Sequence, residues 1–366
     1  MKKYTAKAVK AAAAVLLFVY CLLDTHGTAE AVRSGLRRCT ETVIPSLFAV
    51  MATASVIVRS GITGMMPKWT APVGRLLFGM ERNELPVFTF SMAAGYPVGL
   101  RMLCEEYAAG RISQKRAEFL AGLCFGAGPA FVFGCISRQL YGSAAAGQLI
   151  LLSAVSANVI LAFIMSVPLR RLPSAEHKHR SFNISADMLT DCVIVSGRAM
   201  ADICVMIVFF AVVTRFLVTT GAAAAAGELL GKLPCLGRIR GEALVAAFLD
   251  VTNAEAVPRG DWLLLPYISG LTSFGGVCVM FQLSAIAKGR ISIMPLIIMR
   301  AAAGGLSFFV SMLLLPYFMA GEIVEVSASV GTSAPSPVPS VMLVIMTFML
   351  MLEYGGKKNG KEAYIT

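Results

Sequence analysis

The residues that could do chemistry stand inside apolar stretches. The stretch "SMAAGYPVGLRM" (91–102) carries Gly95, Pro97 and Gly99, followed by Arg101. Proline lacks an N–H and disfavours helix at the preceding residue, so we expect one helix to end here and another to begin near Pro97. The free N–H groups and dipole at that second start favour an anion, and Arg101 adds a positive charge. The alternative is a proline kink with Arg101 extended to the membrane interface.

A second polar group, Asp250, Thr252 and Asn253, interrupts another apolar segment. Ionisable groups inside a membrane are costly and face a cavity or a partner, so these residues are candidates for solute binding. The alternative is that residues 250–260 form a loop, which Pro258-Arg259-Gly260 favours.

Two further features admit a structural and a functional interpretation. Gly128-Pro129 breaks an apolar segment, and we expect it to pack against the break at 95–99, the alternative being a kink without ligand contact. Arg198 and Asp202 stand four residues apart and share one helical face, which predicts a structural ion pair; a proton relay is the alternative.

Signatures of enzymes and of metal sites are missing from the sequence. It contains no HExxH, P-loop or GxSxG motif, and its nine cysteines form no CxxC pair. We therefore expect no enzymatic activity, no cofactor and no metal. The net charge of +11 comes from basic residues clustered between apolar runs, which is typical of loops that set membrane orientation and argues against nucleic-acid binding.

Composition places the chain in a membrane. Of its 366 residues 57% are hydrophobic and 14% charged, whereas about a quarter of the residues of a soluble domain are charged. The mean hydropathy is +0.74. We predict an all-α polytopic membrane protein with about 8–11 hydrophobic helices, since about 20 apolar residues span a bilayer. The candidate spans are residues 8–27, 39–60, 85–104, 117–137, 145–168, 190–218, 242–257, 261–284, 293–319 and 341–353.

We divide the chain into five segments. Residues 1–33 are an N-terminal membrane anchor, with a cleaved signal peptide as the alternative, and residues 169–187 are a basic linker. Residues 34–168 and 188–319 are two halves, and residues 320–366 hold a polar loop, a last short span and a basic tail. Five full spans would place the basic linker opposite the basic N-terminus, against the positive-inside tendency, so membrane orientation stays open.

The two halves share a short repeat. "GRIS" occurs at Gly110 and again at Gly289, an offset of 179 residues, with chance in a chain rich in Gly and Ala as the alternative. At this offset "SMAAGYPVG" aligns with "GLTSFGGVC", which contains Ser273, Gly275 and Gly276. Interrupted helices at matching positions of two halves indicate the midplane site of a transporter, because broken helices persist only where protein or a water-filled cavity receives the freed backbone groups. We predict two inverted-repeat-like halves with broken or re-entrant helices.

The stretches around the first two helix breaks resemble a known family of membrane proteins. "SMAAGYPVGLRMLCEEYAAGRIS" followed by "GLCFGAGPAFVFG" (122–134) resembles the YlbJ-type sporulation integral membrane proteins, which share the nucleoside-recognition (Gate) domain with concentrative nucleoside transporters. The likeness runs from about Gly35 to Leu315. It is sharpest at Gly95-Tyr96-Pro97-Val98-Gly99 and at Gly128-Pro129. Asp250 stands where the family usually has Glu, and the second "GYP" equivalent is degenerate, reading Ser273-Phe274-Gly275-Gly276.

The resemblance implies a carrier in the cell or forespore membrane of an endospore-forming bacterium, moving a small anionic metabolite similar to dipicolinate. Its implied partners are the lipid bilayer, the solute and a coupling ion, H+ or Na+; a homo-oligomer is left open. Its implied substrate-binding residues are Gly95, Tyr96, Pro97, Gly99, Arg101, Gly128, Pro129, Asp250, Thr252, Asn253, Ser273, Gly275 and Gly276. The alternatives are a nucleoside or other small-solute transporter, and a non-transporting membrane scaffold of a sporulation complex.

Overall fold

The structure is a computed structural model that describes residues 2–62, 70–173, 184–232, 237–256, 259–287 and 289–325. The chain divides into two units, Met1–Ala320 and Gly321–Thr366, and all that follows concerns the first. The polar loop predicted after residue 325, the last span at 341–353, the basic tail and residues 174–183 of the basic linker lie outside the described residues.

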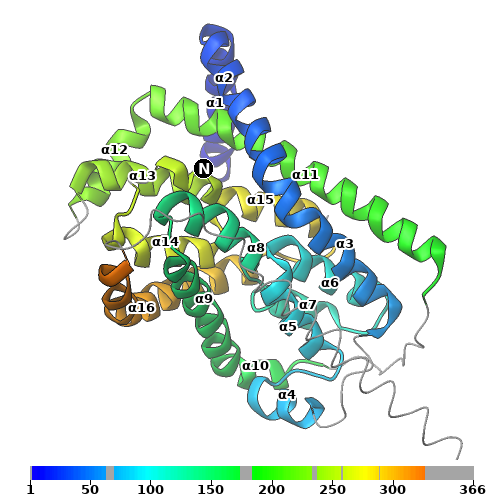
Figure 1. Cartoon of the computed structure of the whole chain (residues 1–366). Coiled ribbons are helices and arrows are strands. Elements are labelled where there is room, and N and C mark those ends of the chain that lie inside the picture. Colours follow the sequence, from blue (N-terminus) through cyan, green and yellow to red (C-terminus); the bar gives the residue numbers. More distant parts are fainter. Residues whose placement is uncertain are drawn as a thin grey trace, which may run out of the picture. The chain divides into compact units, whose positions relative to one another are not determined.

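Every regular element in the described ranges is a helix (Figure 1). Five helical stretches there are long and apolar enough to cross a bilayer: Thr25–Ser60, Ala144–Ile164, Ala186–Thr219, Trp262–Ala287 and Met294–Phe318. The protein is therefore an all-α polytopic membrane protein, as its composition predicts.

The first three helices of the chain are separated by one clear break and one continuous junction. Helix α1 (Lys2–Leu23) ends before Asp24, whose Oδ1 caps α2 (Thr25–Arg38) by accepting the Gly27 N–H at 2.9 Å. Helix α2 runs without a break through a π-helical turn into α3 (Ile44–Ser60), which ends at Gly61 with φ +84°. The expected border at residue 33 thus falls inside a continuous helix. Helices α2 and α3 lie along α11 (Ala186–Thr219).

Two apolar segments are each broken at a glycine. Helix α5 (Glu84–Ala94) stops at Gly95, and α6 (Tyr96–Ala108) starts at the next residue. Gly95 has φ +94° and ψ 168°, a combination accessible almost only to glycine. Helix α14 (Leu265–Phe274) stops at Gly275, with φ +98°, and α15 (Gly276–Ala287) follows. The break glycines are 180 residues apart, within one residue of the repeat offset.

The turns that follow the broken pairs also match. Gly110 has φ +68° and Gly289 has φ +70°, and these are the glycines of the two "GRIS" sequences. Glu118 of α7 (Gln114–Ala121), which follows the first turn, accepts the backbone N–H of Ser292 from the second turn at 2.9 Å. The helix that follows the first repeat is therefore in direct contact with the second repeat.

Helix α7 is fixed by a buried ion pair. Arg116 and Glu84 are both 2% exposed, and two guanidinium nitrogens lie 2.6 Å from the two carboxylate oxygens. The remaining donors of Arg116 bind the carbonyls of Leu169 and Gly79, at the ends of α10 (Ser166–Arg170) and α4 (Thr70–Phe78). This complete set of partners lets a charged pair stay buried at one end of the first half.

The segment predicted as a span at 117–137 is interrupted. After α7 the chain is non-helical from Gly122 to Gly128, and helix resumes at Pro129 with α8 (Pro129–Phe131) and a π-helix (Val132–Tyr141). Proline at the first helical position explains this start, because its missing N–H needs no partner there. Helix α9 (Ala144–Ile164) then forms an unbroken span.

The second half contains two close helix crossings that depend on glycine. Helices α12 (Ala222–Gly231) and α13 (Gly237–Leu249) pack so tightly that a Cβ on Gly241 would lie 2.1 Å from the Gly227 carbonyl oxygen. Helix α16 (Met294–Glu325) crosses α14 at Gly304 and Gly270, where each added Cβ would lie 3.0 Å from the other glycine's oxygen. Small residues at helix contacts are typical of membrane bundles.

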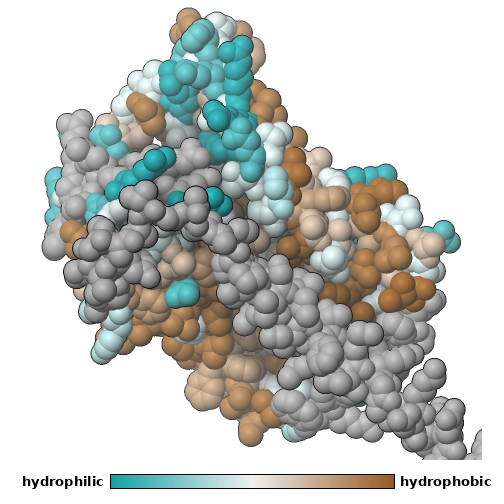
Figure 2. Space-filling view, viewed as in Figure 1, coloured by the Kyte–Doolittle hydropathy of each residue, from teal (hydrophilic) through white to brown (hydrophobic). Residues whose placement is uncertain are grey.

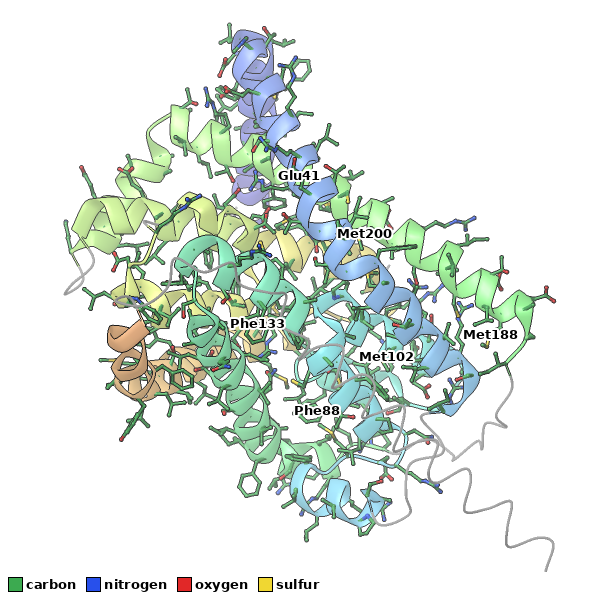
Figure 3. The ribbon with its side chains drawn as sticks, in the orientation of Figure 1. Glu41, Phe88, Met102, Phe133, Met188 and Met200 are labelled. Atoms are coloured by element: carbon green, nitrogen blue, oxygen red, sulfur yellow. The ribbon has the colours of Figure 1, made fainter. Side chains whose placement is uncertain are left out.

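The surface and the interior reflect the membrane environment. Large hydrophobic side chains are exposed on several helices, among them Phe163 at 60%, Val205 at 65% and Phe309 at 67%. Figure 2 shows hydrophobic residues over much of the coloured surface and hydrophilic residues gathered at the top, over α2. Side chains fill the spaces between the helices, with Met200 of α11 and Met102 of α6 both buried (Figure 3).

Candidate functional site

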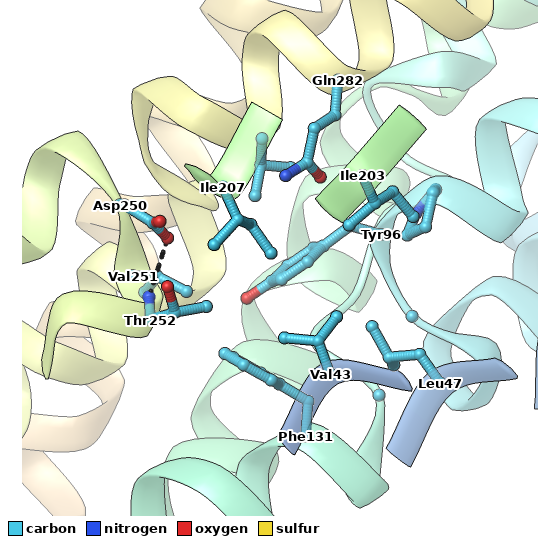
Figure 4. Close-up of a pocket in the computed structure, with 14 residues that line it drawn as sticks. Val43, Leu47, Tyr96, Phe131, Ile203, Ile207, Asp250, Val251, Thr252 and Gln282 are labelled. Carbon is cyan, nitrogen blue, oxygen red and sulfur yellow. Dashed lines mark hydrogen bonds between the residues drawn. The ribbon is translucent and has the colours of Figure 1, made fainter. Parts of the chain in front are cut away.

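A pocket lies where elements of both halves meet (Figure 4). Its cavity volume is about 30 Å³, enough for one or two water molecules, and it is partly open to the surroundings. The first half contributes Val43, Leu47, Gly95, Tyr96, Pro97, Gly128 and Phe131, and the second contributes Ile203, Ile207, Asp250, Val251, Thr252, Val279 and Gln282. Six of the residues predicted to bind solute are thereby brought together: Gly95, Tyr96, Pro97, Gly128, Asp250 and Thr252.

The first helix break forms one wall of the pocket. Helix α6 begins at Tyr96 and the helix from Pro129 begins beside Gly128, so two helix starts adjoin the same space. They are packed closely, because a Cβ on Gly128 would lie 3.1 Å from the Ala93 oxygen and 3.2 Å from the Gly95 nitrogen. The expected packing of Gly128-Pro129 against the break at 95–99 is therefore present in the structure.

Tyr96 connects the two breaks. Its hydroxyl donates to the Thr272 carbonyl oxygen at 2.5 Å. That carbonyl lies in the last turn of α14, where the break leaves carbonyls without partners in their own helix. The Tyr96 ring, 7% exposed, lies 4.7 Å from the ring of Phe125. A side chain at the first break thus satisfies a backbone group freed by the second.

The opposite wall carries the polar group of residues 250–253. Helix α13 ends at Leu249, and a 3-10 turn (Val251–Ala256) follows, so the predicted span at 242–257 is interrupted at Asp250. Asp250 is 1% exposed; its Oδ1 accepts the Thr252 N–H at 2.9 Å, and its Oδ2 has no hydrogen-bond partner. The Thr252 hydroxyl is likewise buried and unpartnered. Unsatisfied buried polar atoms are rare, and they make this wall suited to a polar ligand.

Asn253 points away from the pocket, toward α2 and α11. Its Nδ2 donates to the Thr214 hydroxyl at 3.2 Å, and its Oδ1 accepts a hydrogen bond from the Arg38 guanidinium. The half-buried Arg38 places a positive charge near Asp250. Arg38 was not predicted from the sequence, although it closes a run of basic residues directly before an apolar segment.

The other residues predicted to bind solute lie outside the pocket. A Cβ on Gly99 would lie 2.1 Å from the Cys124 oxygen, so this glycine allows close backbone packing. Arg101 donates to the Val195 carbonyl at 3.1 Å and pairs with Glu105 at 3.4 Å. Pro129 follows the lining residue Gly128. Ser273 donates to the Ala303 carbonyl at 3.4 Å, and Gly275 and Gly276 form the second break.

Arg198 and Asp202 lie one turn apart on α11, and both are exposed. Within the described part of the chain no ion pair joins them. The residues that α11 turns toward the pocket are instead apolar, Ile203 and Ile207. Their spacing of four residues is also that of a helical face, but apolar residues at that spacing occur throughout this chain and do not single out a site.

Gln282 was also missed, although a polar residue inside the apolar run 276–287 is a signal of the same kind as Asp250. It is 7% exposed and lies above Tyr96 in Figure 4.

Across the described residues no three His, Cys, Asp or Glu side chains gather as metal ligands. Comparisons with protein-family models, with curated proteins and with solved structures give no match for this chain.

Proposed function

We propose that the protein is a membrane carrier for a small anionic metabolite, similar to dipicolinate, that acts in endospore formation. The observation that best supports transport is that two apolar segments break at glycines, at equivalent positions of the two halves. A pocket adjoins the first break and also the helix that starts at the second break. Broken helices inside a bilayer are tolerated where they line a cavity or are buried in protein. The choice of cargo rests on the resemblance of the 91–134 stretch to YlbJ-type proteins.

The charges around the pocket constrain the transport cycle. Two helix starts favour an anion, whereas Asp250 repels one. An H+ or Na+ bound together with the solute would offset the charge of this carboxylate, so the proposal includes coupling to one of these ions.

A second candidate cargo is a nucleoside or another neutral polar solute. Besides Tyr96, the polar side chains that line the pocket are Asp250, Thr252 and Gln282, which are suited to hydroxyl and amide groups and include no cation. Thermal stabilisation of the purified protein by nucleosides, and not by dicarboxylates, would favour this cargo.

Uptake of labelled dipicolinate into proteoliposomes tests the proposal. We expect wild-type protein to exceed empty vesicles, and Gly95→Ala to lose most of the uptake, because its backbone conformation costs a side chain about 1–3 kcal/mol and the helix start at the pocket must shift. Gly142→Ala is the matched control: Gly142 has φ +61°, no atom lies within 4 Å of an added Cβ, and it is absent from the pocket lining.

Two outcomes would contradict the proposal. Wild-type uptake equal to that of empty vesicles would exclude dipicolinate as the cargo. Equal uptake by wild type, Gly95→Ala and Gly142→Ala would show that the break at Gly95 does not form the site.

A further inference from the structure

Arg300 is a fully buried cation without an acidic partner. Its side chain, on α16, is 0% exposed, and no carboxylate of the described residues lies within ion-pair distance. One terminal nitrogen donates to the Phe125 carbonyl at 3.2 Å and the other to Asn158 Oδ1 at 2.7 Å. The Nε atom is buried and has no hydrogen-bond partner.

The contacts of Arg300 solvate its charge only in part. The guanidinium carbon lies 4.6 Å from the centre of the Phe125 ring, an arrangement that attracts a cation through the negative face of the ring. Carbonyl dipoles and an aromatic face reduce the cost of burial, but they leave one full positive charge uncompensated. Buried charges in membrane bundles are normally paired, and an unpaired one points to a functional role.

Arg300 stands directly behind the pocket. The Phe125 ring that it contacts lies 4.7 Å from the Tyr96 ring, and Tyr96 lines the pocket. Phe125 also abuts the second break, since a Cβ on Gly275 would lie 2.6 Å from its ring. Two aromatic rings therefore separate the cation from the pocket, at the point where both helix breaks meet.

From this arrangement we infer that Arg300 is the anion-recognising residue of the carrier and binds a carboxylate group of the solute through Nε and a terminal nitrogen once the Phe125 and Tyr96 rings move aside. The inference rests on the proposed function. It supplies the cation that the pocket lining lacks, and the planar fork of arginine matches a carboxylate. Asn158 orients the guanidinium: its Oδ1 accepts from Arg300, and its Nδ2 donates to the same Phe125 carbonyl at 2.6 Å.

A purely structural role would not require the charge. Glutamine could donate to the Phe125 carbonyl without the cost of burying a cation. Arg101, by contrast, has its charge balanced by Glu105 and lies outside the pocket lining, although the sequence suggested it for the same role.

Binding of two probes to the purified protein in detergent tests the inference. Dipicolinate is a dianion at neutral pH, and its diamide is a neutral molecule of similar shape. We expect Arg300→Gln to weaken dipicolinate binding tenfold or more, measured by calorimetry, and to leave diamide binding within twofold of wild type. Arg290→Gln, the same substitution at an exposed arginine ten residues earlier, serves as the control and is expected to leave both unchanged.

The outcomes separate this inference from the proposed function. If wild-type protein binds dipicolinate and Arg300→Gln binds it equally well, the inference fails and the carrier proposal stands. If both probes weaken equally in Arg300→Gln, Arg300 is structural and the inference fails. If wild-type protein neither binds nor transports dipicolinate, both fail. Should Arg300→Gln not fold, Arg300→Lys decides: a selective loss of dipicolinate affinity supports the inference, and an equal loss for both probes overturns it.

Discussion

At the scale of single residues, Tyr96 does the most to connect the two halves. Its hydroxyl is the donor for a carbonyl that lost its helical partner when α14 broke, and the carbonyl is buried with it. Leaving a buried carbonyl without its donor lowers the free energy of unfolding by more than an exposed hydrogen bond contributes to it. Tyr96 therefore stabilises the broken conformation of the second half from a position in the first.

Tyr96→Phe is expected to lower the stability of the folded protein by about 1–3 kcal/mol, because the ring is kept while the Thr272 carbonyl becomes unpaired. The matched control is Tyr267→Phe: the Tyr267 ring packs on Phe308, and the described structure gives its hydroxyl no hydrogen bond. Thermal unfolding of the two variants in the same detergent measures the difference. Equal midpoints would mean that the bond between the breaks contributes no stability.

Sequence reasoning at this scale found the residues that break helices and missed which side chains contact each other across the halves. Gly95 and Pro97 act on their own backbone, so their effect can be predicted from neighbouring residues. The contacts of Tyr96 with Thr272, and of Arg300 with Phe125 and Asn158, join positions far apart in the chain. No local pattern carries that information, and only the packing of the helices reveals it.

At the scale of elements, the sequence predicted the helix interruptions better than the helix borders. The breaks at Gly95 and Gly275 follow from glycines at matched positions, and Asp250 ends α13 where a polar residue enters an apolar run. The border expected at residue 33 falls inside α2, where Gly35 is accommodated within the helix, and the π-helical turn keeps the backbone bonded from α2 into α3. Composition shifts alone do not end helices.

The crossing of α14 and α16 provides a test at this scale. We expect Gly304→Val to destabilise the protein by about 1–3 kcal/mol, because its Cβ would lie 3.0 Å from the Gly270 oxygen and 3.3 Å from the Phe274 Cβ, beside the second break. Gly305→Val, one residue on, is the control, since no atom lies within 4 Å of its Cβ. The two substitutions have the same intrinsic helix propensity, so the difference in their unfolding midpoints isolates the crossing.

If the Gly304→Val and Gly305→Val variants unfold at the same temperature, then α14 and α16 lie farther apart at Gly304 than the structure shows. A lower midpoint together with reduced dipicolinate uptake would indicate that this crossing also holds the second break in place.

At the scale of the whole molecule, helix α11 shows how the chain enters the membrane. Its 34 residues extend over about 50 Å, more than the roughly 30 Å of a hydrocarbon core. Exposed charged residues recur along its first half, at Asp187, Asp191, Arg198 and Asp202. Residues 203–220 contain a single charge, Arg215, and include the two isoleucines of the pocket. We therefore expect residues 203–220 to cross the hydrocarbon core and the first half of α11 to extend beyond it.

This assignment fixes the two ends of α11 on opposite faces of the membrane, and cysteine labelling can test it. Ile184→Cys lies just before the helix and Thr220→Cys just after it, and both native residues are exposed. We expect a membrane-impermeant maleimide to label the first variant from one side only and the second from the other side only, each above the reaction of the unsubstituted chain. Labelling of both variants from the same side would mean that α11 does not cross, and Ile203 and Ile207, its two contributions to the pocket lining, would then not belong to a membrane-spanning segment.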